Sequence, residues 1–257
     1  MKIQVLILAG GRGLRLPEET SERPKPLVEI GNKPILCHLM KIYSHYNYND
    51  FIICLGYKGY MIKDYFLHFY EHINNIYLNL ETGEKRISSF REPWKINLID
   101  TGENTATAGR MLFAKGFLNP KESFMMNYSD GLSNIDINKV VNFHNKHKKL
   151  ATFVAVKTPS KFGTVSFSEN GTVKEFGEKL PDGSYINGGF FVLQAEVFKY
   201  IKDDETSWEF DVLPELVKDK QHMAYKYDGF WKSMDSLKDK MELEEMWNSG
   251  KAPWKIW

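Results

Sequence analysis

One short segment near the N-terminus limits the fold more than any other. The sequence KIQVLILA, residues 2–9, contains an unbroken run of apolar residues. Such a run is typical of a strand that is covered on both faces of a parallel sheet. Three glycines within four positions, Gly10, Gly11 and Gly13, end the run. The segment therefore predicts an α/β protein whose first strand leads into a glycine-rich loop.

The rest of the chain alternates predicted helices and strands. Helices are predicted over residues 34–46, 58–73, 105–116, 136–147, 209–218 and 236–248. Strands are predicted at 50–56, 76–80, 96–100, 123–131, 151–156, 186–193 and 223–228, with a hairpin around Asn170–Gly171. Residues 81–94 have no period and much charge, which predicts a long exposed loop or hairpin. The fold class is α/β: a doubly wound, mostly parallel, Rossmann-like sheet with a smaller antiparallel elaboration in the second half.

Composition excludes several classes of protein. The chain has 257 residues and a net charge of +1, from 34 basic and 33 acidic residues. A general nucleic-acid binder usually carries a basic excess, so no nucleic-acid partner is predicted. No apolar segment approaches the roughly twenty residues that cross a bilayer, and Cys37 and Cys54 both lie in apolar runs. We therefore expect a cytoplasmic protein with two buried free thiols and no membrane partner.

The glycine loop has the composition of a phosphate site. Glycines let the backbone approach a phosphate closely and turn its N–H groups toward the oxygens. Arg12 and Arg15 could add charge-assisted contacts, because the arginine fork suits phosphate geometry. A plain turn between a strand and a loop is the alternative, and the loop alone does not decide between them. The loop is neither a Walker loop nor a dinucleotide fingerprint, since GGRGLR has the spacing of neither.

Three further charged residues follow strands or prolines. Lys25 lies between Pro24 and Pro26, which hold it in an extended segment. Asp130 and Asp235 each follow a predicted strand, and two carboxylates with substrate phosphates are a usual way to hold Mg²⁺. Taken singly, Lys25 could be a surface lysine in a turn. Each acid could equally be a helix N-cap, Asp235 especially, because a helix follows it.

Two other features favour structural roles. His144 and His147 lie three positions apart on a predicted helix, but no third ligand is apparent nearby. A solvated surface is therefore favoured over a metal site. The C-terminal segment MWNSGKAPWKIW has three tryptophans, which favours a packing or subunit contact over a binding site.

Together these segments resemble the sugar-phosphate nucleotidyltransferases. LAGGRGLRL followed closely by RPKPLVEIGNKPIL is similar to the signature of that superfamily. Within it, the resemblance is closest to the branch that transfers a cytidylyl group to glucose 1-phosphate. The marks of that branch are EET, DFIICLGYKGYMIKDYF, REPWKINLIDTG, INGGFFVL, GFWKSMD and GKAPWK, which extend over nearly the whole chain. In addition, DTGENTATAGRM stands where thymidylyl and uridylyl relatives usually carry a Gly-Leu-Ala-Gln-like segment, and this supports CTP.

The resemblance implies a reaction and a role for each site residue. An oxygen of a sugar 1-phosphate attacks the α-phosphate of CTP, giving a CDP-sugar and pyrophosphate for surface-polysaccharide synthesis. Arg15, Lys25 and Asp130 form the implied catalytic set, and Asp130 and Asp235 hold Mg²⁺. The nucleotide contacts are Leu8, Ala9, Gly10, Gly11, Arg12, Gly13, Leu14, Thr105, Arg110 and Ser129. The sugar-phosphate contacts are Lys179, Asn187 and Gly188.

The resemblance also implies an organisation for the chain. Residues 1–257 form one nucleotidyltransferase domain. It comprises a nucleotide-binding core (1–150), a sugar-binding elaboration (151–230) and a C-terminal helix and tail (231–257). Relatives of this type assemble as trimers or hexamers, so we expect a homo-oligomer, with residues 81–94 and the aromatic-rich ends as contacts.

Three positions depart from the family pattern and keep other readings open. Leu14 replaces a threonine near the phosphates, Ser129 replaces the first glycine of Gly-Asp-Gly, and Leu180 replaces the proline of Glu-Lys-Pro. The acceptor could therefore be another sugar or a polyol phosphate, and the base could differ. A catalytically silent nucleotide-sugar-binding relative is the alternative outside the enzymes. The presence of Arg15, Lys25, Asp130 and Asp235 favours an enzyme.

Overall fold

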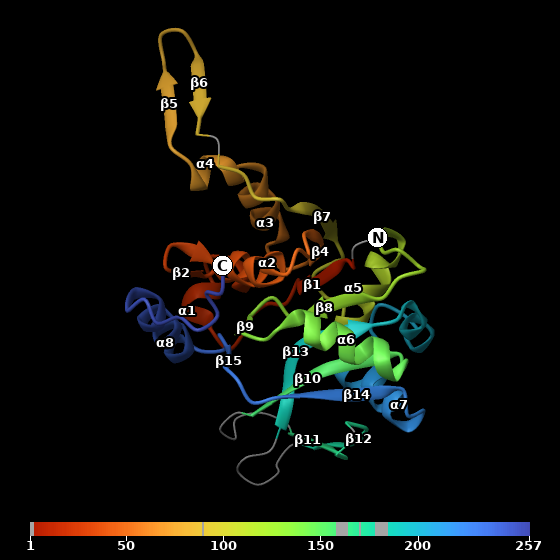
Figure 1. Cartoon of the computed structure of the whole chain (residues 1–257). Helices are drawn as coiled ribbons and strands as arrows, with labels where there is room; N and C mark the ends of the chain where they lie inside the picture. Colours follow the sequence, from red (N-terminus) through yellow and green to blue (C-terminus); the bar gives the residue numbers. More distant parts are fainter. Residues whose placement is uncertain (1–2, 89, 158–163, 170, 178–184) are drawn as a thin grey trace.

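The computed structural model describes residues 3–88, 90–157, 164–169, 171–177 and 185–257. A nine-stranded sheet runs through the molecule (Figure 1), and seven of its strands follow the order β12-β11-β13-β8-β1-β4-β7. Strand β10 pairs with both β13 and β14. The strands of the sheet are β1 (Val5–Ala9), β4 (Asp50–Leu55), β7 (Lys95–Asp100), β8 (Phe124–Asn127), β10 (Ala151–Lys157), β11 (Thr164–Phe167), β12 (Val173–Gly177), β13 (Tyr185–Leu193) and β14 (His222–Tyr227).

The first half of the chain builds the parallel core of this sheet. Strand β1 pairs in parallel with β4 on one side and with β8 on the other, and β4 pairs in parallel with β7. All five residues of β1 are buried, which is the burial expected of a parallel strand covered on both faces. The predicted first strand is confirmed.

Helices cover both faces of the sheet, as predicted for a doubly wound fold. Val5 and Ile7 of β1 face a core shared with α2 (Ile35–His45) and α6 (Ile137–His147). Leu6 and Leu8 face the opposite core, shared with α5 (Thr107–Ala114) and α7 (Leu213–Lys218). The remaining α-helices are α1 (Pro17–Thr20), α3 (Gly59–Leu67), α4 (Phe69–Ile73) and α8 (Leu237–Asn248). No helix among the described residues has the length and apolarity to span a bilayer.

The second half adds antiparallel pairs. β13 runs antiparallel to β8 and β10, and β11 runs antiparallel to β12. Gly171 has φ +86°, as the predicted tight turn requires, while Asn170 lies outside the described residues. Two predicted helices differ in detail. Residues 58–73 form two helices that meet at His68, and the helix predicted from 209 begins as a π-helical turn, Trp208–Val212.

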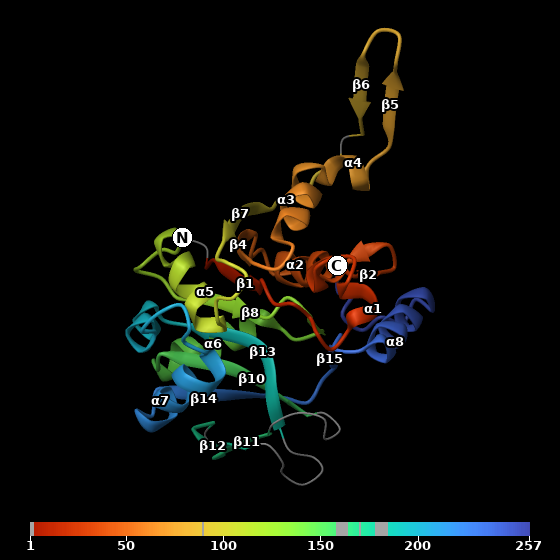
Figure 2. The same ribbon diagram turned by 180° about the vertical axis from the view of Figure 1, so that it is seen from behind.

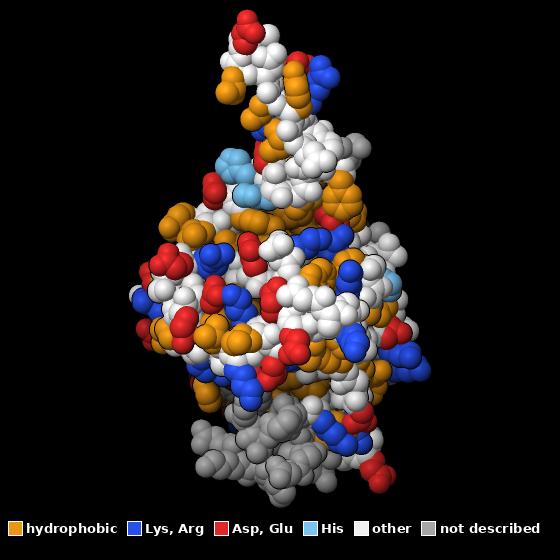
Figure 3. Space-filling model, turned by 90° about the vertical axis from the view of Figure 1, so that its left-hand side faces the viewer, with side chains coloured by type: hydrophobic (Ala, Val, Ile, Leu, Met, Phe, Trp, Pro, Cys, Tyr) orange, Lys and Arg blue, Asp and Glu red, His pale blue; other side chains and the backbone are white. Residues whose placement is uncertain are grey.

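A hairpin projects from the body as a narrow arm (Figures 1 and 2). It consists of β5 (Ile76–Asn79) and β6 (Glu84–Ile87), which form a two-stranded sheet of their own within the described part of the chain. The hairpin reading of residues 81–94 is thus confirmed over its first part. Leu78 and Leu80 are 56% and 92% exposed, and apolar side chains are visible along the arm in Figure 3.

The C-terminal segment packs against the body. Trp254 is fully buried, and its indole Nε1 contacts His38 Nδ1 at 3.3 Å. Phe230 and Trp247 stack near it, with ring centroids at 5.7 and 6.4 Å. The predicted packing role of these tryptophans is confirmed. Cys37 and Cys54 are likewise buried and free, as predicted.

The two histidines of α6 were predicted to be solvated, and this prediction is wrong for His144. Its side chain is fully buried, and Nδ1 lies 2.9 Å from Thr152 Oγ1, while Nε2 lies 2.9 Å from Gln194 Nε2. His147 is half-buried and shares the same Thr152 hydroxyl at 2.6 Å. The helix carries these rings toward β10 rather than toward solvent. Burial lowers the pKa of His144 and His147 to about 4.

This burial predicts acid-sensitive stability. Between about pH 6.5 and 4 the unfolded chain takes up a proton at His144 that the folded protein refuses, so stability falls as the pH falls. The lowered pKa of His144 alone reduces the free energy of unfolding by about 2 kcal/mol at pH 5. We expect the free energy of urea unfolding to fall between pH 7 and pH 5 in the wild type. In His144→Gln this fall should be smaller by about 2 kcal/mol. His68→Gln, which removes an exposed histidine, is the control. A His144→Gln variant with the wild-type pH dependence would contradict this prediction.

Candidate active site

A cleft of 730 Å³ lies at the carboxyl ends of β1 and β8, where ligands bind in open α/β sheets. Sixteen predicted site residues line it: Leu8, Ala9, Gly10, Gly11, Arg12, Gly13, Leu14, Arg15, Lys25, Thr105, Arg110, Ser129, Asp130, Asn187, Gly188 and Asp235. Lys179, and Leu180 beside it, lie outside the described residues. The fold therefore brings together residues that are up to 227 positions apart (235 minus 8).

The glycine loop is held open by contacts to its carbonyl groups. Gly13 has φ +63°, a conformation that favours glycine. Thr20 of α1 donates its hydroxyl to Gly13 O at 3.1 Å and to Leu16 O at 2.9 Å. Tyr57 N donates to Gly10 O at 3.0 Å. These contacts fix the loop at the floor of the cleft before any ligand is bound.

Arg110 is buried beneath the loop. Its guanidinium donates to carbonyl oxygens of Leu55, Gly102, Glu103 and Gly10 at 2.7–3.2 Å, and to Thr101 Oγ1 at 2.8 Å. These acceptors lie at or just beyond the carboxyl ends of β1, β4 and β7. Arg110 thus ties three strand ends together. Burial lowers its pKa, against the opposing effects of Cys54 and Asp100.

The two acids meet because of a short antiparallel ladder. β9 (Gly131–Ser133) pairs with β15 (Trp231–Ser233), with Gly131 opposite Ser233. Met234 N donates to Asp130 O at 3.0 Å, so Asp130 and Asp235 lie at the same end of the ladder. The N-cap reading of Asp235 is wrong. Ser236 caps α8, in a capping box with Asp239.

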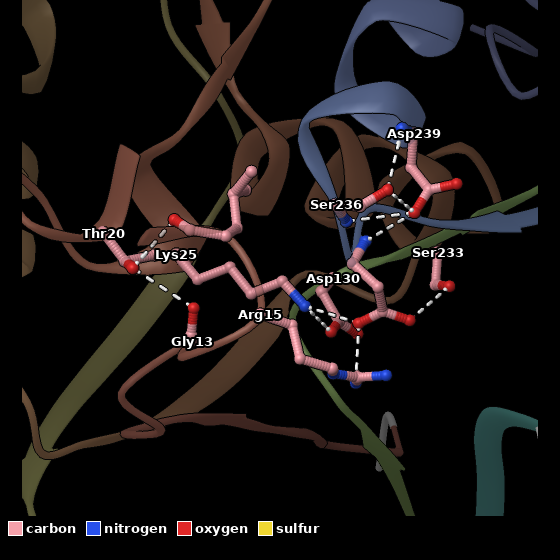
Figure 4. Close-up of polar contacts among 10 residues, drawn as sticks. Gly13, Arg15, Thr20, Lys25, Asp130, Ser233, Ser236 and Asp239 are labelled. Atoms are coloured by element: carbon pink, nitrogen blue, oxygen red, sulfur yellow. Dashed lines mark hydrogen bonds and ion pairs between the residues drawn. The ribbon is translucent and has the colours of Figure 1, made fainter. Parts of the chain in front are cut away.

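Two cations contact this acid pair (Figure 4). Lys25 Nζ lies 2.5 Å from Asp130 Oδ2 and 2.9 Å from Asp235 Oδ1, and Arg15 lies 2.7 Å from Asp235 Oδ1. Desolvation alone would lower the pKa of Lys25, but the two carboxylates outweigh it and raise that pKa. Desolvation opposes ionisation of Asp235, yet Lys25, Ser233 and Arg15 lower its pKa. Lys25 and Asp235 are therefore held in their charged forms.

The carboxylate pair of Asp130 and Asp235 is chemically suited to bind a divalent cation. Asp130 and Asp235 supply hard carboxylate oxygens that already surround one positive group, the Lys25 ammonium. No group of three or more His, Cys, Asp or Glu side chains arranged for a metal occurs among the described residues. Mg²⁺ suits such a two-carboxylate site, because it usually keeps several waters and also binds substrate phosphates.

Two further lining residues of the cleft carry polar groups that the sequence did not indicate. Glu209 lies in the π-helical turn, and its Oε2 accepts from Thr107 Oγ1 at 2.7 Å and from Ser207 Oγ at 3.1 Å. The buried hydroxyl of Tyr128 makes no hydrogen bond of ordinary geometry to any described residue. Burial, together with Glu209, raises the pKa of Tyr128 well above its usual value. The π-helical turn that contains Glu209 is a feature frequent at functional sites. No sequence pattern predicted this turn.

The remaining predicted residues take peripheral positions. Arg12 pairs with Glu103 at 2.9 Å, and Thr105 donates its hydroxyl to Thr101 O. Leu14 is 79% exposed at the rim of the cleft. Gly188 O accepts from Trp231 Nε1 at 2.7 Å, which joins β13 to the β9–β15 ladder.

Comparison with known proteins identifies the family. The nucleotidyl transferase family model matches residues 4–246. The chain belongs to this family. The glucose-1-phosphate cytidylyltransferase of Salmonella typhi is 44% identical over 257 residues, which cover 99% of this chain and all of that protein. The probable glucose-1-phosphate cytidylyltransferase of Bacillus subtilis strain 168 is 43% identical over 256 residues, with 99% and 100% covered. The sequence resemblance is thereby confirmed.

A solved structure supports the fold of this nucleotidyltransferase. HddC from Yersinia pseudotuberculosis superposes with a TM-score of 0.77 at 22% identity, over 95% of this chain and 99% of that one. The predicted α/β class is confirmed by this likeness and by the strand order described above.

The packing of Arg110 predicts unequal costs for two adjacent substitutions in the nucleotidyltransferase. A Cβ atom at Gly10 would lie 2.2 Å from Arg110 Nη1 and 2.4 Å from Cζ, whereas a Cβ at Gly11 would meet no atom within 4 Å. Arg110 cannot move without losing hydrogen bonds. We expect Gly10→Ala to cost about 1–3 kcal/mol, which lowers Tm by several degrees, while Gly11→Ala unfolds like the wild type. Thermal unfolding of the ligand-free variants measures this, and equal Tm values would contradict it.

Proposed function

We propose that this nucleotidyltransferase transfers a cytidylyl group from CTP to a sugar 1-phosphate, with α-D-glucose 1-phosphate as the acceptor. The observation that carries the proposal is the convergence of Arg15, Lys25, Asp130 and Asp235 beside the glycine loop in one cleft. The choice of base and sugar draws on the full-length similarity to proteins named glucose-1-phosphate cytidylyltransferase.

In this proposal the reaction is a single displacement at phosphorus. An oxygen of the sugar phosphate forms a bond to the α-phosphorus of CTP as the bond to the bridging oxygen of the β-phosphate breaks. Pyrophosphate leaves with that electron pair. No covalent step falls to the protein, so its contribution is positioning and electrostatic stabilisation. The glycine loop would hold the triphosphate, while Arg15 and Lys25 would neutralise charge that builds up on the leaving pyrophosphate.

We propose Mg²⁺ as the metal, held by Asp130 and Asp235. When bound, Mg²⁺ would neutralise phosphate oxygens at the reacting centre. Ser233 donates its hydroxyl to Asp235 Oδ2 at 2.8 Å, which orients this carboxylate and leaves Oδ1 toward the cleft. Asp130 is fixed by the backbone bond of its carbonyl to Met234 N.

The acceptor would lie against the second half of the chain, residues 151–230. Asn187 accepts from Gly189 N through Oδ1 at 2.9 Å, and Asn187 and Gly188 both line the cleft. Glu209, whose carboxylate accepts hydrogen bonds, lines the same cleft. Such a mixed set suits a polyhydroxylated ligand. Lys179 would contact the sugar phosphate.

Two other functions remain as outcomes of the test. Leu14 and Ser129 lie at the cleft, so another sugar or polyol phosphate could be the acceptor, or another nucleotide the donor. A relative that binds nucleotide-sugars without catalysis would keep the fold, but it would not require the complete set of two acids and two cations.

The decisive assay is pyrophosphate release with Mg²⁺ and glucose 1-phosphate, offering CTP, UTP, dTTP, ATP and GTP in turn. We expect release with CTP alone. Asp130→Asn should reduce the rate by about 10²-fold or more, since one electrostatic partner at the reacting centre is worth about that factor. Asp219→Asn, an exposed carboxylate bonded to Tyr200, is the control and should react like the wild type.

Other results of this assay would redirect the proposal. Release with a second sugar or polyol phosphate, but none with glucose 1-phosphate, would assign a different acceptor. Nucleotide binding without release for every acceptor would indicate the non-catalytic alternative.

We also propose that the chain forms a homo-oligomer, a trimer or hexamer, through the β5–β6 arm. A lone two-stranded hairpin is marginally stable in water, and this one exposes Ile76, Tyr77, Leu78 and Leu80. Exposed apolar surface of this kind is typical of protein contacts. A second copy of the chain would cover it.

Substitutions on the arm test this assembly. We expect Leu78→Lys combined with Leu80→Lys to shift the mass measured by light scattering after gel filtration toward the monomer, because charge replaces the apolar contact. Phe117→Lys, on the body and 51% exposed, is the matched control and should leave the mass unchanged. An unchanged mass in the arm variant would place the subunit contact elsewhere.

A further inference from the structure

The ammonium of Lys25 lies between the two acids that the proposed function assigns to the metal (Figure 4). Its Nζ contacts one oxygen of each acid, at 2.5 and 2.9 Å. The side chains of Lys25 and Asp235 are each only 11% exposed, and that of Asp130 is 24% exposed. One cation thus already occupies the position between both carboxylates.

A divalent cation and this ammonium compete for the same oxygens. Mg²⁺ binds oxygen at about 2.0–2.1 Å, so an ion held by both carboxylates would lie against Lys25 Nζ. Arg15 adds a second cation on the same oxygen of Asp235, at 2.7 Å. Like charges at such short range repel strongly, most of all where water is largely excluded. The metal cannot enter while Lys25 stays where it is.

The charges balance in only two arrangements. Asp130 and Asp235 carry two negative charges, and Lys25 and Arg15 carry two positive ones, so the cluster is neutral by itself. A metal that binds the two carboxylates alone would leave Lys25 and Arg15 without partners, close to a third positive charge. A metal that arrives with a nucleotide brings phosphate oxygens to which Lys25 and Arg15 can turn. Every charged group then keeps a partner.

We propose that Lys25 holds the metal position in the nucleotide-free protein, and that a divalent cation binds tightly there only together with the nucleotide. This inference rests on the proposed function in one respect, the assignment of Asp130 and Asp235 as metal ligands. By linkage, the metal strengthens nucleotide binding as much as the nucleotide strengthens metal binding. Lys25 is thus a positioning residue for the metal as well as a contact for the phosphates.

The test measures Mn²⁺ binding to the nucleotide-free protein, following the electron paramagnetic resonance signal of the free ion. We expect weak binding in the wild type and at least tenfold tighter binding in Lys25→Met and in Lys25→Gln. Lys240→Met is the matched control. It also removes one lysine that pairs with a carboxylate, that of Glu19, and it should bind Mn²⁺ like the wild type. Adding Asp130→Asn to Lys25→Met should abolish the gain.

Three results would overturn the inference: equal affinity in the wild type and both Lys25 variants, a gain that survives Asp130→Asn, or an equal gain in Lys240→Met. If removal of Lys25 prevents folding, Arg15→Met decides. Arg15 is 68% exposed, and its loss should tighten Mn²⁺ binding in the same direction by a smaller factor. An unchanged affinity in that variant would then contradict the proposal. Because the assay contains neither CTP nor a sugar phosphate, its outcome is separate from that of the pyrophosphate assay.

Discussion

The close approach of Asp130 and Asp235 is the constraint on which the rest of the site depends. Two carboxylates at one end of a three-residue ladder repel each other unless cations lie between them. Lys25 and Arg15 supply those cations from the first 25 residues of the chain. The ion pairs therefore connect the segment after the first strand to the segment before the last helix. The site thus links the N-terminal and C-terminal parts of the chain.

A second constraint acts from beneath the glycine loop. A buried arginine is usually paired with a carboxylate. Arg110 instead donates to backbone carbonyls at or just beyond the ends of three neighbouring strands. With its carbonyls bound by Arg110, Tyr57 and Thr20, the loop has a fixed shape. A phosphate that enters meets donors already in place, and preorganisation of this kind lowers the cost of binding.

Local signals in the sequence predicted the parts of the site that depend on local structure. Gly13 and Asp130 follow apolar runs that predict strands, and Lys25 stands between two prolines. Asp235 follows an aromatic-rich segment. The pairing of β9 with β15 could not be predicted, because two three-residue strands carry no period. Glu209 was not predicted for a similar reason, since the apolar residues of a π-helical turn have no distinct spacing in the sequence. The burial of His144 was not predicted because its polar partners, Thr152 and Gln194, come from outside the helix.

The backbone and side chain of Lys25 have separate tasks. Two prolines fix the backbone at the edge of the cleft, so the lysine loses little freedom there when a ligand binds. Its four-carbon side chain remains long enough to reach either the acids or a phosphate in the same cleft. Arginine at this position would bind a carboxylate or phosphate in a bidentate fork and would exchange between them less readily. A flexible point charge on a rigid backbone therefore suits a site in which one cation must leave as another arrives.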